Sequence, residues 1–461
     1  MTKILTIVNG ALWGIPALVL ILGVGLYLTV RLGFVQLRLF PRAMGLFFAK
    51  LRPGKGEGGV SEFQALCTAL AATVGTGNLV GVAGALCLGG PGAIFWMWVC
   101  GILGMATKYG EVTLALRYRV KTPEGYAGGP MYTIVRGLGE KWRPLAVCYC
   151  LFGLIAAFGV GCGTQVNAVV SSVGTVLSQL GRQRSWQTDL AVGLLLALVL
   201  GTLLLGGTPK ITAAAERLVP FAAAGYILLC VAGLWLGRRE IPGAVAAIFR
   251  GAFTPGAVTG GLLGSAFQAL RVGCSRGVFT NESGMGTASI AHACAQAPHP
   301  AQQGLMGIVE VFLDTIVICT MTALVILVSG VPIPYGRDAG AELTLSAFSR
   351  FFGSSAGVLL SLFLICFALA TVLGWGLYGR RFAGFLWGNR CPKWFVFWQI
   401  AAIAAASVVD TAAVWQLSET LNGLMVIPNL IALAMLFPEL RRLTKEYTGG
   451  NYADFHQRKP L

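Results

Sequence analysis

The sequence has little charge. Charged residues occupy 11% of its 461 positions, against roughly 25% in an ordinary soluble protein. Apolar residues make up 56%, and a soluble chain of this composition would lack the polar surface needed to cover its core. The composition therefore excludes a soluble enzyme, a disordered chain and a collagen-like repeat, and it indicates a membrane protein.

Patterns for metal and disulfide chemistry are also scarce. The three His, at positions 292, 299 and 456, are too few and too loosely spaced for a metal site. The 12 Cys are scattered, mostly within apolar segments, and form no C-x-x-C pair, which favours small hydrophobic thiols over a disulfide scaffold. The formal net charge of +16 would suggest nucleic acid for a soluble protein. Here the basic residues lie between apolar stretches and indicate membrane topology instead.

Apolar segments of about 20 residues, the length of one bilayer crossing, recur along the whole chain. We therefore predict an all-α polytopic membrane protein with about 11 transmembrane helices. No connection between these helices is long enough for a separate soluble domain. The predicted spans cover residues 12–30, 63–88, 93–116, 145–177, 190–205, 218–236, 258–278, 307–328, 358–378, 394–409 and 414–437.

Lys and Arg are divided unequally between the two sets of connections. The set that contains residues 31–55, residues 117–143 and the C-terminal tail holds 25 of them, counting Arg271 and Arg276, and the opposite set holds eight. Because basic connections stay in the cytoplasm, we predict a cell-membrane protein with its N-terminus outside and its C-terminus cytoplasmic.

The second predicted span carries residues unsuited to an unbroken helix. Gly75, Gly77 and Asn78 fall near the bilayer midplane, where unwound backbone is tolerated only if it lines a cavity and holds something polar. A broken helix offers amides to an anion and carbonyls to a cation. The alternative interpretation is close helix packing mediated by the two Gly.

A second interruption is predicted around the seventh span. Residues 254–265 are Gly-rich and stand at its start, and residues 271–286 contain a further polar stretch. Four intact spans separate the two interruptions, so each would open a five-helix repeat, as the inverted repeats of transporters require.

Polar residues inside other spans are candidates for function. Gln165 follows a Gly-rich run that permits close approach of a substrate or of neighbouring backbone. Thr371 can give a hydroxyl to a small hard cation, although a Thr in a membrane helix commonly bonds the carbonyl four residues before it.

Two pairs of ionisable residues also lie within spans. Glu310 and Asp314 share one helix face through their i, i+4 spacing, and they form either a proton or cation site or a hydrogen-bond network to the first broken helix. Lys108 and Glu111, at i, i+3 spacing, are interpreted as a structural or gating ion pair rather than as substrate ligands.

Several long motifs follow one another in order between about Gly59 and Arg442. Together they resemble the signature of the alanine or glycine:cation symporter family, within the amino acid-polyamine-organocation superfamily. The motifs are the run from Phe63 to Asn78, Gly89-Gly90-Pro91-Gly92-Ala93, Met105-Ala106-Thr107-Lys108-Tyr109, Gly128-Gly129-Pro130-Met131-Tyr132, the run from Arg276 to Gly286, the stretch from Glu310 to Leu324, and Gly374-Trp375.

This resemblance implies Na⁺-coupled symport of small neutral amino acids such as alanine and glycine into the cell by alternating access. It also implies a five-plus-five inverted-repeat (LeuT-like) fold with one extra N-terminal helix. For the substrate site it implies that the amides of Thr76 and Gly77 face the substrate carboxylate. Side-chain hydrogen bonds would come from Asn78 and Gln165, and Phe267 would form the wall that limits side-chain size.

For the coupling ion, the resemblance implies a Na⁺ site on two helices. The carbonyl groups of Ala71, Val74 and Ala368 and the hydroxyl group of Thr371 would be its ligands. A proton could take the place of Na⁺ as the coupling ion.

We expect three regions: an N-terminal helix and basic loop over residues 1–60, an inverted-repeat core over 61–440, and a cytoplasmic tail over 441–461. The expected partners are a small neutral amino acid and the lipid bilayer, with no nucleic acid. Three alternatives remain open: a proton-coupled amino-acid symporter, a channel, and a membrane-embedded enzyme.

Overall fold

The structure of the chain is a computed structural model. It describes residues 8–10, 12–13, 15–51, 59–123, 125–179, 181–254, 266–338, 340–388, 391–409 and 412–449. Most of the predicted Gly-rich stretch at 254–265 therefore lies outside the described residues.

The described residues are almost entirely helical, and helices occupy most of each predicted span, although residues 258–265 of the seventh lie outside the described residues. The elements are α2 (Ile15–Arg31), α3 (Val35–Arg38), α4 (Phe40–Lys50), α5 (Glu62–Thr73), η1 (Gly77–Gly81), α6 (Val82–Gly89), α7 (Gly92–Arg117), β1 (Val120–Thr122), β2 (Gly125–Ala127), α8 (Pro130–Thr133), η2 (Ile134–Leu138), η3 (Glu140–Trp142), α9 (Arg143–Phe158), η4 (Gly159–Gly163), α10 (Thr164–Gln179), α11 (Trp186–Leu205), α12 (Gly207–Leu236), η5 (Arg238–Glu240), α13 (Ile241–Phe253), α15 (Ala266–Asn281), α16 (Ala288–His292), α17 (Pro300–Val311), η6 (Phe312–Cys319), α18 (Thr320–Val328), α19 (Gly340–Phe352), α20 (Ser355–Trp387), α21 (Cys391–Ala406), α22 (Ala412–Met435) and α23 (Phe437–Thr448).

Several helices have the length and composition to cross a bilayer. Five meet both conditions within the described ranges, or up to seven if each of two bent helix pairs counts as one span. The prediction of eleven spans is therefore neither confirmed nor contradicted. One of the bent pairs is Glu62–Thr73 with Gly77–Gly89, at 51°, so the second predicted span is broken.

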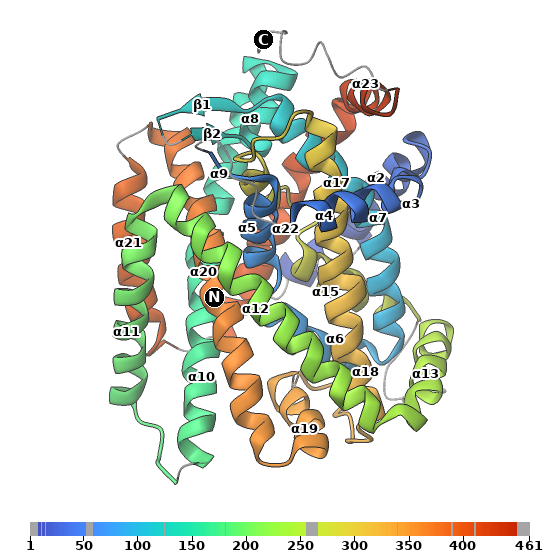
Figure 1. Ribbon diagram of the computed structural model, residues 1–461, viewed down its shortest axis with the longest axis vertical. Coiled ribbons are helices and arrows are strands. Elements are labelled where there is room, and N and C mark those ends of the chain that lie inside the picture. The colour runs from blue at the N-terminus through green and yellow to red at the C-terminus, as the bar shows by residue number, and fades with distance from the viewer. Residues whose placement is uncertain are drawn as a thin grey trace.

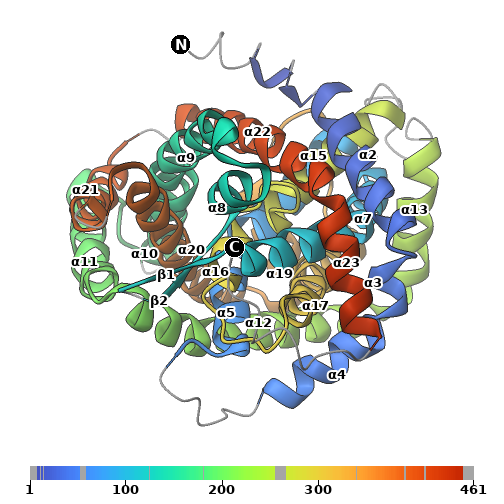
Figure 2. The ribbon, with the colours of Figure 1, turned by 90° about the horizontal axis from the view of Figure 1, so that it is seen from above.

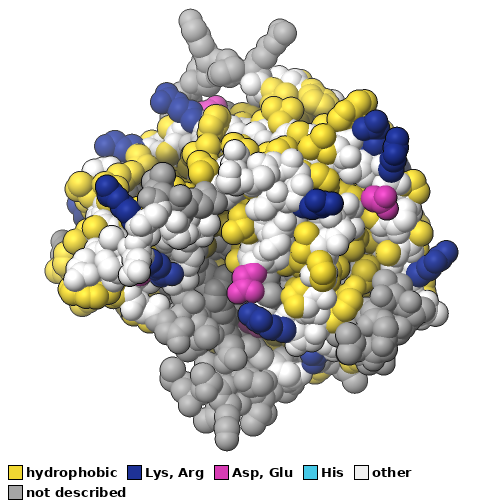
Figure 3. Space-filling model, turned by 90° about the horizontal axis from the view of Figure 1, so that it is seen from below, with side chains coloured by type: hydrophobic (Ala, Val, Ile, Leu, Met, Phe, Trp, Pro, Cys, Tyr) yellow, Lys and Arg dark blue, Asp and Glu magenta, His cyan; other side chains and the backbone are white. Residues whose placement is uncertain are grey.

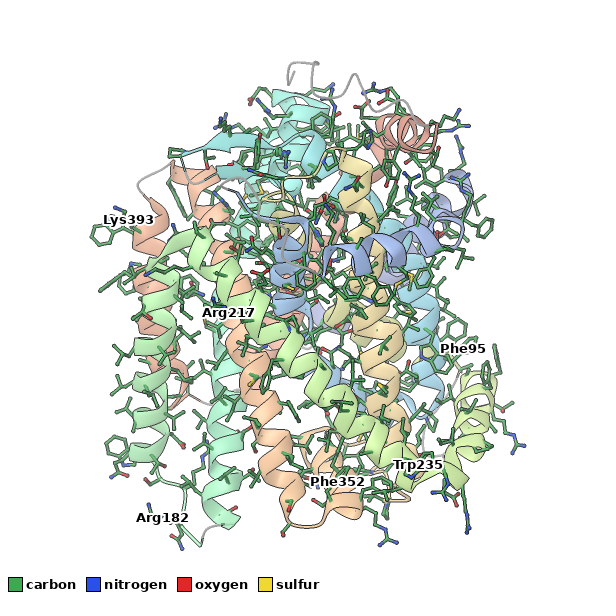
Figure 4. The ribbon with its side chains drawn as sticks, viewed as in Figure 1. Phe95, Arg182, Arg217, Trp235, Phe352 and Lys393 are labelled. Carbon is green, nitrogen blue, oxygen red and sulfur yellow. The ribbon has the colours of Figure 1, made fainter. Side chains whose placement is uncertain are left out.

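The two ends of the molecule carry different elements. In Figure 1 the hairpin of β1 and β2, α8 and α23 lie at the upper end, whereas α19 and the connection between α10 and α11 lie at the lower end. Figure 4 accordingly places Lys393 high and Arg182 and Phe352 low. Seen from above, α5, α16 and α17 are central, with α11 and α21 at one edge and α2 and α13 at the other (Figure 2).

Large apolar side chains on the outer helices point away from the molecule. Leu198 on α11 and Leu228 on α12 are each 68% exposed, and Trp235 is 69% exposed. In a soluble protein such a surface would be an aggregation hazard, whereas lipid tails solvate it. Seen from below, hydrophobic side chains also fill much of the lower face, and the basic side chains are spread over it rather than gathered in one patch (Figure 3).

The predicted helical fold holds, with one short hairpin added, in which Val120–Thr122 pairs antiparallel with Gly125–Ala127. One expectation needs correction. Arg271 and Arg276 do not lie at the end that carries this hairpin. Arg276 forms ion pairs with Asp338, just before α19, at 3.1 Å and with Glu419 at 3.2 Å. The hydropathy pattern placed Arg271 and Arg276 with the cytoplasmic connections. It does not show that both residues lie within α15, which continues to Asn281.

Candidate functional site

The first helix break lies at residues 74–76, between α5 and η1. A capping box starts α5, in which Ser61 Oγ accepts from the Gln64 amide at 3.0 Å and Gln64 Oε1 accepts from the Ser61 amide at 3.0 Å. The helix ends at Thr73, and Val74 is extended, with φ −78° and ψ 102°. The chain then resumes as a π-helical turn at Gly77. The break predicted around Gly75, Gly77 and Asn78 is thus confirmed, and it lies slightly earlier, at residues 74–76.

Asn78 holds this break open. The Gly75 amide donates to Asn78 Oδ1 at 2.9 Å, and the Asn78 amide donates to the Gly75 carbonyl at 3.2 Å. In an unbroken helix these two amides would bond the carbonyls four residues earlier, those of Ala71 and Val74. Both carbonyls are therefore released from their usual helical partners, and they are two of the predicted cation ligands.

Two other helices approach the break at Gly75. A Cβ placed on Gly75 would lie 2.8 Å from Thr371 Oγ1 on α20 and 3.8 Å from Gln165 Oε1 on α10. A Cβ on Gly374, one turn further along α20, would likewise lie 2.8 Å from Ala72 Cβ. Only residues without a side chain permit this approach, so the sequence brings the break, α10 and α20 into contact.

The four predicted cation residues are all buried on these facing elements, Ala71, Val74, Ala368 and Thr371 being at most 2% exposed. Thr371 Oγ1 donates to the Phe367 carbonyl at 3.0 Å, which is the local bond that the sequence left open. A hydroxyl that donates one bond keeps its lone pairs for a cation, so this bond orients Thr371 without excluding it as a ligand.

The two ends of the Gln165 side-chain amide differ in their hydrogen bonding. Its Nε2 lies 3.3 Å from Thr76 Oγ1, from the Val160 carbonyl and from Thr164 Oγ1. Its Oε1 is buried and has no hydrogen-bond partner among the described residues. A buried acceptor without a partner is unusual in a folded protein, and this one lies beside the break.

The side chain of Asn78 is fully engaged within the protein. Its Nδ2 donates to Asp314 Oδ1 at 2.7 Å, and Asp314 Oδ2 accepts from Thr315 Oγ1 at 2.9 Å. In this structure the Asn78 side chain therefore bonds within the protein, and a hydrogen bond from Asn78 to a substrate stays a prediction. The sequence left open whether Asp314 forms a cation site or a network to the broken helix, and the structure contains the network.

The same network reaches a second helix break. Asn281 Nδ2 donates to Thr315 Oγ1 at 3.0 Å, and Asn281 Oδ1 accepts from the Ser283 amide at 2.9 Å. Residues 282–287 separate α15 from α16 and include Glu282, Gly284 and Gly286 at φ values of 53°, 92° and 76°. This second break at residues 282–287 overlaps the end of the predicted 271–286 stretch, whereas most of the predicted interruption at 254–265 lies outside the described residues. Asp314 and Thr315 bridge the second break to the first.

Phe267 does not lie at the breaks. It is 49% exposed near the start of α15, and at about 1.5 Å per residue it is roughly 18 Å along the helix from Phe279. A Cβ on Gly77 would lie 3.1 Å from Thr280 Cγ2 and 3.4 Å from Phe279 Cδ1. The aromatic residue of α15 beside the first break is therefore Phe279. The second break begins at residue 282, about one turn after the end of the predicted span, so hydropathy did not show which end of α15 approaches the first break.

Lys108 pairs across helices rather than within its own. Its Nζ lies 3.5 Å from Glu310 Oε1 on α17, and His292 Nε2 lies 2.9 Å from Glu310 Oε2. Gln303 Nε2 in turn lies 2.8 Å from His292 Nδ1. The sequence singled out Lys108 and Glu310 but not His292, because nothing local relates residues so far apart in the chain.

A cavity of about 190 Å³ reaches the first break from the side of α19. Its wall is mostly apolar, and the hydroxyl and amide groups on it come from Thr76, Thr164, Asn167, Ser171, Thr344 and Ser361, among others. Within the described ranges no three His, Cys, Asp or Glu side chains converge as a metal site. The groups that the break and α20 present are carbonyl and hydroxyl oxygens, the ligands that hard cations prefer.

Comparison with known proteins shows what this arrangement is similar to. The profile of the sodium:alanine symporter family matches residues 1–459. The chain belongs to this family. The sodium/alanine symporter AgcS of Methanococcus maripaludis is 43% identical over 437 residues, 93% of each chain. An uncharacterized transporter of Haemophilus influenzae is 43% identical over 451 residues, 96% of each chain.

The fold has a solved counterpart. The crystal structure of MhsT in complex with L-phenylalanine matches with a TM-score of 0.62 at 13% sequence identity, over 83% of this chain and 90% of that one. This likeness shows a LeuT-like transporter fold. With the family match it confirms the resemblance seen in the motifs and indicates a multi-pass membrane protein of a sodium and alanine transport family.

Proposed function

We propose that the protein is a secondary active transporter that carries small neutral amino acids, alanine and glycine, into the cell together with Na⁺ by alternating access. The observation that carries this proposal is the first break, where the carbonyls of Ala71 and Val74 are released beside Thr371. Among the described residues, Gln165 Oε1 has no hydrogen-bond partner there. A zwitterion needs an anion partner and a cation partner a few ångströms apart, and a broken helix offers both.

In this proposal the substrate lies at the start of the second half-helix. Thr76 and Gly77 provide the first amides of that half-helix, which have no carbonyl partner within it and attract a carboxylate through the helix dipole. Gln165 Oε1 accepts from the substrate ammonium group. Phe279 and Thr280, which pack against Gly77, limit the side chain that fits, at about 1–3 kcal/mol per excess methylene.

Na⁺ binds between α5 and α20 in this proposal. Its ligands are the carbonyls of Ala71, Val74 and Ala368 and the hydroxyl of Thr371. Asn78 supports the site from outside, since it keeps the Ala71 and Val74 carbonyls free. Because the ion and the substrate share one break, occupation of either stabilises the backbone conformation that the other requires, which is the origin of coupling.

The topology proposed here places about 11 helices in the plasma membrane in two inverted five-helix repeats after the extra helix α2. The core covers residues 61–440, between the 1–60 region and the 441–461 tail. The end with the β hairpin is cytoplasmic, so the cavity at α19 opens to the outside. An outward cavity that ends at Thr76 supports uptake by a carrier, whereas a channel requires a continuous polar pore.

The test is uptake of radiolabelled alanine into proteoliposomes that contain the purified protein. An inward Na⁺ gradient is expected to drive accumulation above the external concentration, and collapse of that gradient by an ionophore is expected to abolish it. Uptake that only equilibrates would indicate a channel. Accumulation driven by a proton gradient without Na⁺ would indicate a proton-coupled symporter, and conversion of alanine to another compound would indicate an enzyme.

A further inference from the structure

A buried carboxylate on α7 has one oxygen satisfied and one without a partner. Glu111 is 4% exposed, and its Oε1 accepts from the Gly284 amide at 2.8 Å and from Asn429 Nδ2 at 2.7 Å. Its Oε2 has no hydrogen-bond partner within the described ranges. The substrate and Na⁺ sites proposed above do not use this residue, so its free oxygen requires its own explanation.

The surroundings of Glu111 contain more acid than base. Glu111, Glu282 and Glu310 are all buried and all act electrostatically on the single ammonium of Lys108. In the described structure Lys108 Nζ has its 3.5 Å ion pair with Glu310 Oε1, and Ser283 Oγ is buried without a hydrogen bond. Three carboxylates beside one lysine leave excess negative charge in a medium of low dielectric constant, which is costly unless a further cation is bound.

The charged and polar groups that face Glu111 come from several packed elements. They are Lys108 on α7, Glu282 in the second break, Glu310 on α17 with its partner His292 on α16, Tyr149 on α9, Thr133 on α8 and Asn429 on α22. The carboxylates are too dispersed for a metal ion, since no three acidic, His or Cys side chains in the described residues converge on one point. A proton is the cation that dispersed carboxylates can hold.

A small cavity adjoins Glu111 on the side of α8. It has a volume of about 10 Å³ and is lined by Thr133, Ser289 and Asn429 besides apolar side chains. That volume suits about one water molecule, and the polar groups supply its hydrogen bonds. Because α8 lies at the upper end of the molecule (Figure 1), a water molecule there lies between Glu111 and the end proposed to be cytoplasmic.

We propose that Glu111 is a proton-binding site linked to the second helix break. Its Oε2 takes a proton from hydronium in the adjoining cavity, forming an O–H bond and leaving water, and returns it by the reverse step. The Gly284 amide, which belongs to the break, stabilises the ionised form of Glu111. When the break moves and this donor is withdrawn, the anion is less stable and the carboxylate takes up the proton.

This inference rests on the proposed function, because it assumes that the second break moves during transport. It assigns a proton to the transport cycle in addition to Na⁺. The rate of Na⁺-driven uptake should therefore depend on pH through Glu111.

The experiment measures Na⁺-driven alanine uptake into proteoliposomes as a function of pH for the wild type, Glu111→Gln and Glu342→Gln. Glu342 is a matched control, since its side chain is 72% exposed and pairs with Arg337, which is equally exposed. We expect a sigmoidal pH profile in the wild type and in Glu342→Gln, and a flat profile in Glu111→Gln, whose amide cannot bind a proton. A pH profile in Glu111→Gln identical to that of the wild type would overturn the inference.

A second variant keeps the test decisive if Glu111→Gln does not fold. Asn429→Ala removes one N–H donor to the carboxylate and leaves the acid in place. It is expected to move the midpoint of the profile to higher pH by about one unit, and an unmoved midpoint would count against the inference. Wild-type protein that accumulates no alanine under a Na⁺ gradient would overturn the proposed function itself, which separates the two failures.

Discussion

At the scale of single residues, the account depends on which atoms lack partners. Thr371 is the one side-chain ligand in the proposed Na⁺ site. We expect Thr371→Val, which keeps the shape and removes the hydroxyl, to raise the Na⁺ concentration for half-maximal uptake roughly 10- to 100-fold, since a bond to a charged group contributes about 1.5–3 kcal/mol. The measurement is alanine uptake over a Na⁺ titration.

The matched control for this change is Thr202→Val. Thr202 is exposed on α11 and also bonds within its helix, to the Val199 carbonyl at 2.8 Å. The same loss of a hydroxyl there should leave the Na⁺ titration unchanged. Equal titration curves for both variants and the wild type would remove Thr371 from the site.

Gly75 is predicted to tolerate no side chain. A Cβ there would meet Thr371 Oγ1 at 2.8 Å, whereas a Cβ on Gly81, in the same half-helix region, would meet nothing within 4 Å. Overpacking costs about 1–3 kcal/mol, so Gly75→Ala should lower uptake about 10-fold or more while Gly81→Ala stays close to the wild type. Both variants should be compared for expression and for uptake, and full activity of Gly75→Ala would be evidence against close approach of α20.

Much at this scale could be predicted from the sequence. Two Gly and an Asn in an apolar run indicated the break, and Gln165 and Thr371 do lie at Gly75. The partner of Asn78 could not be decided, because Asp314 is more than 200 positions away and no periodicity relates the two. Phe267 was predicted beside the substrate, whereas it lies near the start of α15, away from the breaks. Hydropathy could not show this, because it does not show where α15 ends.

At the scale of elements, the two breaks are joined by side chains. Asn78 and Asn281 each cap their own break, and Asp314 and Thr315 on η6 connect them. Asp314→Ala removes the shortest hydrogen bond of Asn78 Nδ2 and leaves the two 3.3 Å contacts to the Asp314 carbonyl and to Cys319 Sγ. We expect the loss of this charged acceptor to cost about 1–3 kcal/mol and to weaken the activation by Na⁺ about 10-fold or more. Asp314→Asn keeps an acceptor and should be affected less.

The control for these variants is Asp338→Ala. Asp338 pairs with Arg276 at a partly exposed site, and such pairs contribute roughly 0–1 kcal/mol, so little change is expected. Na⁺ titrations of the three variants give the rank order. If Na⁺ activates uptake by Asp314→Ala as it does uptake by the wild type, the connection through Asp314 has no part in forming the cation site.

The elements themselves were largely predictable, because apolar length identifies a helix that crosses a membrane. The second break at 282–287 was harder, since the most Gly-rich stretch, 254–265, precedes it and lies outside the described residues. The β1–β2 hairpin was not predicted, because its strands are only three residues each and lie in a polar connection.

At the scale of the whole molecule, the unequal distribution of Lys and Arg predicts which end faces the cytoplasm. Arg182 and Lys393 are exposed at opposite ends (Figure 4). A membrane-impermeant thiol reagent added to intact cells is expected to label Arg182→Cys and not Lys393→Cys, and the unmodified chain gives the background from its own cysteines. Labelling of Lys393→Cys alone would reverse the proposed orientation.

The central claim is that one helix break holds an amino acid and Na⁺ together. The most direct measurement is the dissociation constant of alanine from the detergent-solubilised protein as a function of Na⁺ concentration, with choline replacing Na⁺ to keep ionic strength constant. The account predicts that Na⁺ tightens alanine binding about 10-fold or more, and that alanine tightens Na⁺ binding by the same factor, because linkage is reciprocal. An alanine dissociation constant that is the same in Na⁺ and in choline would contradict it.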